Sequence, residues 1–232
     1  MLSRITAAVL VLSLAACAAP RPRPRPPLPP APAGAGLASL PAPGEYRIDS
    51  ANSELRLLVY RAGPLSNLGH NHVLVNRELT GIVQIGASVS ASSFALKVPV
   101  DGFVVDDAQA REEEGGDFPG DIPQDAKAGT RRNMLSAAVL NGAQFPDITV
   151  QSMALAGSLD ALSAELQISA AGHSSKITAP LRLQGDTQHV TAVGSMEIRQ
   201  TALGLAPYSL LGGALQVQDA MQLKFKITLA TN

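Results

Sequence analysis

The sequence predicts an all-β domain, a barrel or a sandwich of eight or nine antiparallel strands with one helical insertion. Short runs of alternating or β-branched apolar residues recur along the chain, and turn residues separate them. In the first run Leu55, Leu57 and Val59 alternate with Glu54 and Arg56, which is typical of a strand with one buried face. Further runs lie at 79–85, 94–100, 148–155, 164–170, 176–183, 190–198 and 215–230. Strands and helices do not alternate, which disfavours a parallel sheet with crossover helices.

The middle of the chain departs from this strand pattern. Residues 106–129 are acidic and rich in glycine, and they predict a partly helical excursion or a mobile loop. The run Glu112-Glu113-Glu114 resembles a solvated segment more than a pair of catalytic carboxylates, because adjacent residues do not face one another. A short helix is predicted at 130–140, where apolar residues share one helical face and Asn141-Gly142 provides a stop.

The amino-terminal segment predicts an exported lipoprotein. Residues 1–16 combine a basic start with an apolar run too short to span a bilayer, as a signal peptide does. The run ends in Leu14-Ala15-Ala16-Cys17, and Cys17 is the only cysteine of the chain. Small residues directly before a cysteine resemble a bacterial lipobox, so we expect lipid attachment at Cys17, with palmitate among the acyl chains. The alternative is an ordinary signal peptide with an incidental cysteine.

Residues 17–44 form the predicted tether between this anchor and the folded domain. They are almost entirely Pro, Ala, Gly and Arg, and proline cannot donate to a helix or a sheet. An extended spacer is expected, holding the domain at 45–232 away from the membrane. Because Ala18 rather than Asp follows Cys17, resemblance to bacterial lipoproteins favours a periplasmic location at the outer membrane. With 18 basic and 19 acidic residues, no charge excess indicates a nucleic-acid partner.

Four stretches, taken in order, resemble the YceI-like family of bacterial exported, polyisoprenoid-binding proteins, here in a lipoprotein variant. They contain Tyr46-Arg47-Ile48-Asp49, Phe145-Pro146-Asp147-Ile148, Gly172-His173-Ser174-Ser175-Lys176, and Ile198-Arg199-Gln200 with Leu203-Gly204. The order and spacing of the four motifs are more specific than any one of them. The chain departs from the family pattern at Leu203, where phenylalanine is usual, and in its long acidic insertion.

The resemblance implies a lipocalin-like, antiparallel eight-stranded barrel whose interior holds a polyprenyl lipid or an isoprenoid quinone. The resemblance is also compatible with a homodimer. Composition supports a hollow interior independently, because aromatic residues make up only 3% of the chain and few bulky side chains are available to fill a barrel. The opposing interpretation is a smaller, well-packed barrel without a cavity.

The stretch His70-Asn71-His72 is the candidate functional site. On a strand His70 and His72 project to the same face, where the two rings could share one metal ion with a further ligand from His173 or from the acidic loop. Alternatively, the three residues contact a polar lipid head group at the barrel rim, or the histidines tie down a turn. Arg131 and Arg132 are additional rim candidates, since guanidinium groups bind carboxylate or pyrophosphate head groups.

The leading hypothesis is non-enzymatic binding of an isoprenoid or other amphiphilic lipid inside the barrel of an envelope lipoprotein. No nucleophile elbow, phosphate-binding loop or dinucleotide fingerprint occurs in the sequence. One alternative is a metal- or haem-binding periplasmic redox or stress protein that uses His70 and His72. A second alternative is a structural or adaptor lipoprotein with a filled barrel.

Overall fold

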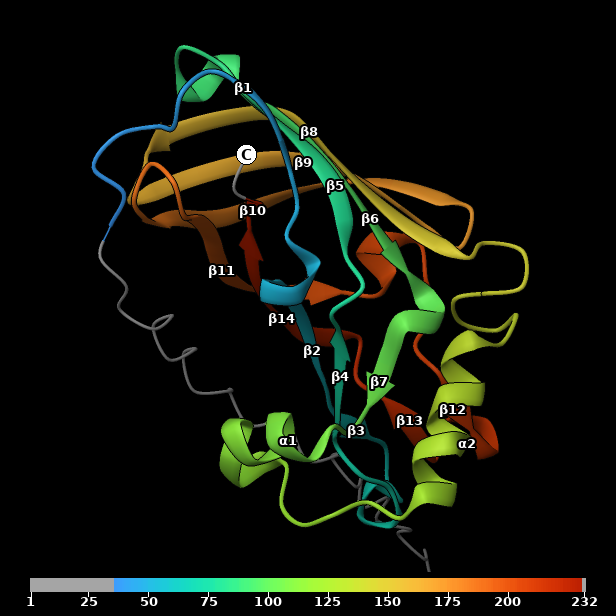
Figure 1. Ribbon diagram of the computed structural model, residues 1–232. Helices are drawn as coiled ribbons and strands as arrows, with labels where there is room; N and C mark the ends of the chain where they lie inside the picture. The colour runs from blue at the N-terminus through green and yellow to red at the C-terminus, as the bar shows by residue number, and fades with distance from the viewer. Residues whose placement is uncertain (1–35, 231–232) are drawn as a thin grey trace, which may run out of the picture.

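The computed structural model describes residues 36–230, and its main feature is one strongly curled antiparallel sheet (Figure 1). In spatial order its strands are β1 (Gly44–Arg47), β5 (Thr80–Ile85), β6 (Ser93–Pro99), β8 (Asp147–Ser158), β9 (Ala161–Ala170), β10 (His173–Gly185), β11 (Val190–Arg199), β14 (Ala220–Thr228), β2 (Glu54–Val59), β4 (His72–Asn76) and β7 (Phe103–Val105). This architecture confirms the predicted all-β class.

The curled sheet meets itself just after β1. The Asp49 N–H donates to the Thr228 carbonyl at 2.9 Å, and the Ala230 N–H donates to the Arg47 carbonyl at 2.8 Å. These bonds join β1 to the end of β14, which is the eighth strand in spatial order, and so link eight strands in a ring at this end. The predicted lipocalin-like barrel is confirmed, with β2, β4 and β7 as an extension of its wall.

Smaller elements gather at the lower end of the barrel in Figure 1. A second sheet pairs β12 (Ser209–Leu210), β13 (Leu215–Val217) and β3 (Arg61–Ala62). The helices are α1 (Ala108–Glu114) and α2 (Gln124–Leu135), and within residues 36–230 neither has the length and apolar character of a membrane span. Short 3-10 turns complete the described chain: η1 (Ser50–Asn52), η2 (Ser66–Leu68), η3 (Val89–Ala91), η4 (Val100–Gly102), η5 (Gly115–Asp117), η6 (Thr201–Leu203) and η7 (Leu211–Gly213).

The helix predicted at 130–140 is displaced in the structure. It starts earlier, at Gln124, and ends at Leu135. It stops there because the backbone N–H and the hydroxyl of Ser136 both donate to the Asn133 carbonyl, at 3.2 and 2.7 Å. The strand predicted at 215–230 is likewise interrupted, because Asp219 turns away to accept the Thr201 N–H at 2.9 Å.

In the acidic run at the end of α1, Glu112 and Glu113 are exposed, as predicted for a solvated segment, but the side chain of Glu114 is buried against the barrel. Arg56, which projects from the outer face of β2, lies 2.9 Å from both Glu113 and Glu114. Lys224 of β14 also pairs with Glu114, whose side chain is only 6% exposed. Burial disfavours the charge on Arg56, but the hydrogen bonds that its guanidinium donates to Glu113 and Glu114 outweigh this effect and raise its pKa. These ion pairs hold α1 against the barrel wall.

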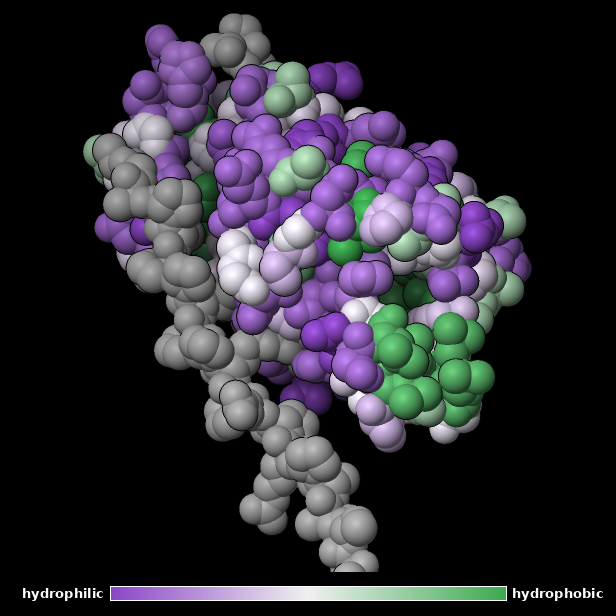
Figure 2. All heavy atoms as spheres, turned by 90° about the horizontal axis from the view of Figure 1, so that it is seen from below, coloured by the Kyte–Doolittle hydropathy of each residue, from purple (hydrophilic) through white to green (hydrophobic). Residues whose placement is uncertain are grey.

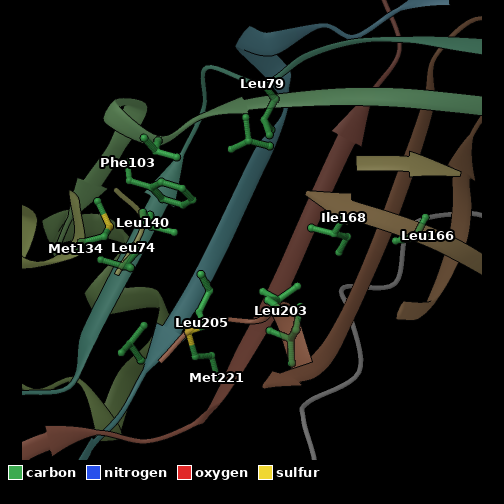
Figure 3. Packing of buried hydrophobic residues seen from close by; sticks show 14 of the residues in the cluster. Leu74, Leu79, Phe103, Met134, Leu140, Leu166, Ile168, Leu203, Leu205 and Met221 are labelled. Atoms are coloured by element: carbon green, nitrogen blue, oxygen red, sulfur yellow. The ribbon is translucent and has the colours of Figure 1, made fainter. Parts of the chain in front are cut away.

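Alternation along β2 divides the hydrophobic residues between two cores. Leu55, Leu57 and Val59 face the interior cluster, and Leu58 faces a small outer cluster beneath α1. The outer cluster consists of Leu58, Tyr60, Val73, Val75, Ala110 and Phe118. Figure 3 shows part of the interior cluster, in which side chains from opposite walls approach one another: Leu74, Leu79, Phe103, Met134, Leu140, Leu166, Ile168, Leu203, Leu205 and Met221. The interior of the barrel is therefore its main apolar core, and that core is where the cavities lie.

Candidate functional site

Two adjoining apolar cavities occupy the barrel interior. The lower cavity, of about 310 Å³, lies beside α2 and the β3–β13–β12 sheet, and the upper cavity, of about 170 Å³, is lined mainly by residues of β5, β6, β9, β10 and β11. Six side chains line both cavities and mark where they adjoin: Leu55, Val98, Val150, Ile168, Ile198 and Leu223. Because cavities of this size remain, the barrel is not filled by its own side chains, which argues against the filled-barrel alternative.

Polar groups are concentrated in the lower cavity. Among residues 36–230, Ser92 is the only side chain with a nitrogen or oxygen atom that lines the upper cavity, and the other lining residues are apolar. The lower cavity adds polar or charged side chains from the segment that runs from β2 into β4, from α2 and from the segment that runs from β11 into β13: Tyr60, Arg61, His70, His72, Thr130, Asn133, Gln200, Tyr208 and Gln216. It also reaches the surface there, since Arg61 and Leu210 are both lining residues and exposed. The interior is thus largely apolar, and most of its few polar side chains lie around the lower cavity.

His72 is held rigidly in the wall of the lower cavity. Its Nδ1 lies 2.7 Å from Oδ2 of Asp106, and its Nε2 lies 3.4 Å from Oγ1 of Thr130. Asp106 follows β7 with a φ of 55°, a left-handed conformation that is uncommon outside glycine and aims the carboxylate back at β4. There its other oxygen, Oδ1, accepts the Val73 N–H at 3.0 Å and an Arg111 N–H at 2.7 Å.

Asp106 and Arg111 form a buried ion pair behind the histidine. Only 1% of Asp106 and 4% of Arg111 is exposed. Burial by itself raises the pKa of Asp106, but hydrogen bonds from His72, the Val73 N–H and Arg111 outweigh this and hold the pKa below its ordinary value. An ionised carboxylate can only accept, so the His72 Nδ1 carries the proton of their hydrogen bond.

His70 and Asn71 lie on opposite sides of the chain that enters β4. The rings of His70 and His72 meet edge to face with their centroids 6.2 Å apart, and both line the lower cavity. Asn71 instead accepts the Arg61 N–H at 3.1 Å and donates to the Asp117 carbonyl at 2.8 Å. The structure therefore brings the two histidines together, as the spacing predicts, and uses Asn71 to fix the loop.

The arginine candidates on α2 lie outside the cavity lining. Arg131 donates to the carbonyls of Phe103 and Asp101, each at 2.6 Å, and so ties α2 to β7. Arg132 is exposed. The α2 residues that do line the lower cavity are Thr130, Asn133 and Met134. Thr130, Asn133 and Met134 are three and four residues apart, a spacing that places them on one face of a helix. The sequence-based prediction of this face used only the apolar residue, Met134.

The arrangement around the histidines does not supply the third metal ligand that the sequence hypothesis requires. Within residues 36–230, no three histidine, cysteine, aspartate or glutamate side chains are grouped so that they could hold an ion. Asp106, the acidic side chain that reaches the pair, bonds to a ring nitrogen of His72. His173 opens β10 in an exposed position and packs near Gly204. The predicted lipid-attachment residue, Cys17, lies outside the described residues.

Comparison with known proteins identifies a matching family model and solved structures with a similar fold. A family model described as the YceI-like domain matches residues 46–229. The solved structure of BcnA from Burkholderia cenocepacia is similar with a TM-score of 0.58 and 15% identity, over 78% of this chain and 98% of that one. A polyisoprenoid-binding domain from Saccharophagus degradans, implicated in plant cell wall breakdown, is similar with a TM-score of 0.52 and 10% identity, over 81% of this chain and 98% of that one. Comparison with curated proteins finds no match. The family match and the shared fold agree: this chain belongs to the YceI-like family.

Proposed function

We propose that this protein binds an amphiphilic lipid, with an isoprenoid or similar tail in the two cavities and a polar head group near His70 and His72. The observation that carries this proposal is a largely apolar interior of two adjoining cavities, in which most of the few polar side chains lie around the lower cavity. An amphiphile inserted with its tail first matches that distribution, and the protein needs no catalytic step to act as a binding module.

Burial of the tail supplies the driving force. Each buried methylene contributes about 0.8 kcal/mol, so a few isoprene units in the upper cavity and where it adjoins the lower one account for substantial affinity. The similar domain from Saccharophagus degradans, described as polyisoprenoid-binding, supports the same class of ligand, either a polyprenyl lipid or an isoprenoid quinone. Arg131 and Arg132 remain candidates for a longer head group that extends beyond the cavity.

We further propose that the protein acts in the cell envelope, tethered by an acylated Cys17. The lipobox-like Leu14-Ala15-Ala16-Cys17 and the Pro-rich segment behind it support a periplasmic domain anchored at the outer membrane. An anchor of this kind would keep the barrel close to a source of lipid.

The hydrogen bond between His72 and Asp106 also favours a second candidate, binding of a metal ion or haem iron through the His72 Nε2. Metal-ligating histidines usually donate their other ring N–H to a carboxylate or a carbonyl. Elemental analysis and an absorption spectrum of the purified protein separate the two functions. A His70→Ala/His72→Ala variant should lose a metal but keep a lipid tail.

The direct test of lipid binding is solvent extraction of the purified protein, followed by mass spectrometry of the extract. We expect a prenyl lipid or quinone in near-stoichiometric amount, released on denaturation. A protein that never co-purifies with lipid and shows no affinity for quinone or prenyl analogues would overturn the proposal.

A further inference from the structure

The hydrogen bonds behind His72 indicate which kind of head group the lower cavity selects. Because the Nδ1 proton is donated to Asp106, a neutral His72 presents a lone pair at Nε2. Arg111 lies 2.7 Å from the other oxygen of the Asp106 carboxylate, so that this carboxylate contacts both groups and fixes the orientation of the ring. In this neutral tautomer the Nε2 atom is an acceptor in the wall of the lower cavity.

That acceptor has no strong partner among the residues that line the cavity. Thr130 Oγ1 lies 3.4 Å from Nε2, longer than the 2.7–3.2 Å of ordinary hydrogen bonds. An acceptor among mostly apolar side chains gains most from a ligand that donates to it. A carbonyl or ether oxygen at the same place would set its own lone pair against the lone pair of Nε2, with no hydrogen between them.

Resting on the proposed lipid-binding function, we infer that the head group is a hydrogen-bond donor, a prenyl alcohol or a quinol, in preference to an ether or a quinone. In this arrangement Asp106 and Arg111 are positioning residues, which act through His72 and do not touch the ligand.

The test measures the affinity of the purified protein for geranylgeraniol and for its methyl ether by calorimetry. We expect the alcohol to bind about tenfold more tightly, the effect of one net hydrogen bond of about 1.4 kcal/mol. His72→Phe should abolish that preference by weakening only the alcohol, and the matched control His173→Phe should retain it. Equal affinities in the unaltered protein would overturn the inference, and failure of both ligands to bind would overturn the proposed function instead.

A different observation, on the surface, carries a second inference. Four leucines lie exposed on two segments at the lower end of the barrel, with Leu68 and Leu211 exposed by 68% and 77%. The other two are Leu65 and Leu210. The Leu65 N–H donates to the Ala214 carbonyl at 2.8 Å, which joins the η2 loop to the η7 loop. Figure 2, which views the molecule from below, shows a hydrophobic cluster on an otherwise largely hydrophilic face. We call Leu65, Leu68, Leu210 and Leu211 the leucine tip.

The leucine tip is built at a conformational cost. Leu211 has a φ of 51°, and Gly212 and Gly213 follow with φ values of 64° and 94°. A leucine in this region is strained by about 1 kcal/mol or more, and here the strain places the side chain in solvent, where it contributes little to the core. Such an arrangement indicates that the exposed leucine has a partner.

The surroundings of the leucine tip favour a lipid surface as that partner. Leu210 lines the lower cavity, so the apolar surface of the tip continues into the apolar interior. The chain has 19 aspartate and glutamate residues, but none of them lies in the two segments that carry the leucine tip, 60–71 and 203–218. Arg61 lies at the cavity entrance. Anionic phospholipids would meet no like charge on these segments.

We propose that the leucine tip inserts into a phospholipid bilayer, so that a lipid can enter the lower cavity without crossing water. The test is hydrogen exchange of the full-length Cys17→Ser chain with and without phosphatidylcholine–phosphatidylglycerol vesicles. Amides at 65–69 and 209–214 should exchange several-fold more slowly on vesicles. Leu68→Ser/Leu211→Ser should lose this protection, whereas Ile82→Ser/Met153→Ser, at exposed apolar residues elsewhere, should keep it.

Two results would overturn membrane insertion. One is identical exchange at the leucine tip with and without vesicles, while the rest of the chain remains folded. The other is protection that rises with protein concentration in the absence of lipid, because that result would assign the leucine tip to a contact between copies of the chain.

Discussion

Filling the upper cavity should shorten the tail that the barrel can hold. Ala179 of β10 is buried, lines this cavity, and lies across the strand pair from Ala164, so Ala179→Phe projects a phenyl ring into it. An engineered cavity of about 150 Å³ accommodates a benzene molecule, and the upper cavity measures about 170 Å³. The new ring should therefore fit without unfolding the barrel and should occupy most of the space.

The magnitude follows from the tail atoms that the ring displaces. Exclusion of one isoprene unit removes about five carbons at about 0.8 kcal/mol each, or about 4 kcal/mol, nearly a thousandfold in affinity. A two-unit prenyl alcohol held in the lower cavity should lose almost nothing, so the loss depends on tail length.

The assay is a calorimetric titration of prenyl alcohols of two to six units. The matched control, Ala154→Phe, adds the same ring to an exposed position on β8 and should leave every affinity unchanged. Equal weakening of short and long tails by Ala179→Phe, or no weakening of the long ones, would refute the placement of the tail.

Four further outcomes are expected. Arg111→Met should cost about 3–5 kcal/mol of stability in urea denaturation, because it leaves the Asp106 charge buried without its cation, and adding Asp106→Asn should recover part of this loss. The pKa of Asp106 in the folded protein lies below its ordinary 3.8, so the contribution of this carboxylate to stability is complete above about pH 5 and is lost as the pH falls through the folded pKa. Asp106→Asn should therefore flatten the acid limb of a plot of melting temperature against pH. Gly172→Ala should lower the melting temperature by several degrees, because a Cβ there would approach Phe145 to 2.7 Å at a φ of 82°. Cys17→Ser should abolish palmitate labelling and reduce the membrane-bound fraction.

A specific result would contradict each of these four predictions. An Arg111 variant as stable as the parent would mean that the pair is solvated, and an unchanged acid limb would assign acid sensitivity to other carboxylates. A Gly172 variant without effect would mean that the hairpin relaxes freely around the new methyl group. Continued labelling after the change at Cys17 would exclude this residue as the acylation site.

The alternation of side chains made the strands predictable, and composition made the hollow interior predictable. Leu55, Leu57 and Val59 face the interior as their period of two requires. Low aromatic content indicated a barrel that its own side chains do not fill, and two cavities are present. The helix boundaries were predicted less well, because the first turns of α2 contain Gln124, Asp125 and other polar residues that give no hydrophobic face.

The histidine pair was predictable from a spacing of two, but its supporting residues were not. Asp106 lies 34 residues from His72, and Thr130 lies 58 residues from it, so only the folded sheet brings them together. Nothing local in the sequence indicates that Asp106 adopts a left-handed conformation, or that Arg111 turns inward from α1 to neutralise it. These long-range contacts determine the chemistry of the site.

The central claim, that a lipid tail runs through both cavities from a head group at His72, is tested most directly by a crystal structure with a prenyl alcohol brominated at its tail end. We predict an anomalous bromine peak in the upper cavity near Ala164 and Ala179, with the hydroxyl within hydrogen-bonding distance of His72 Nε2. A bromine peak at the barrel surface, or one beside His72 with the hydroxyl in the upper cavity, would contradict the account.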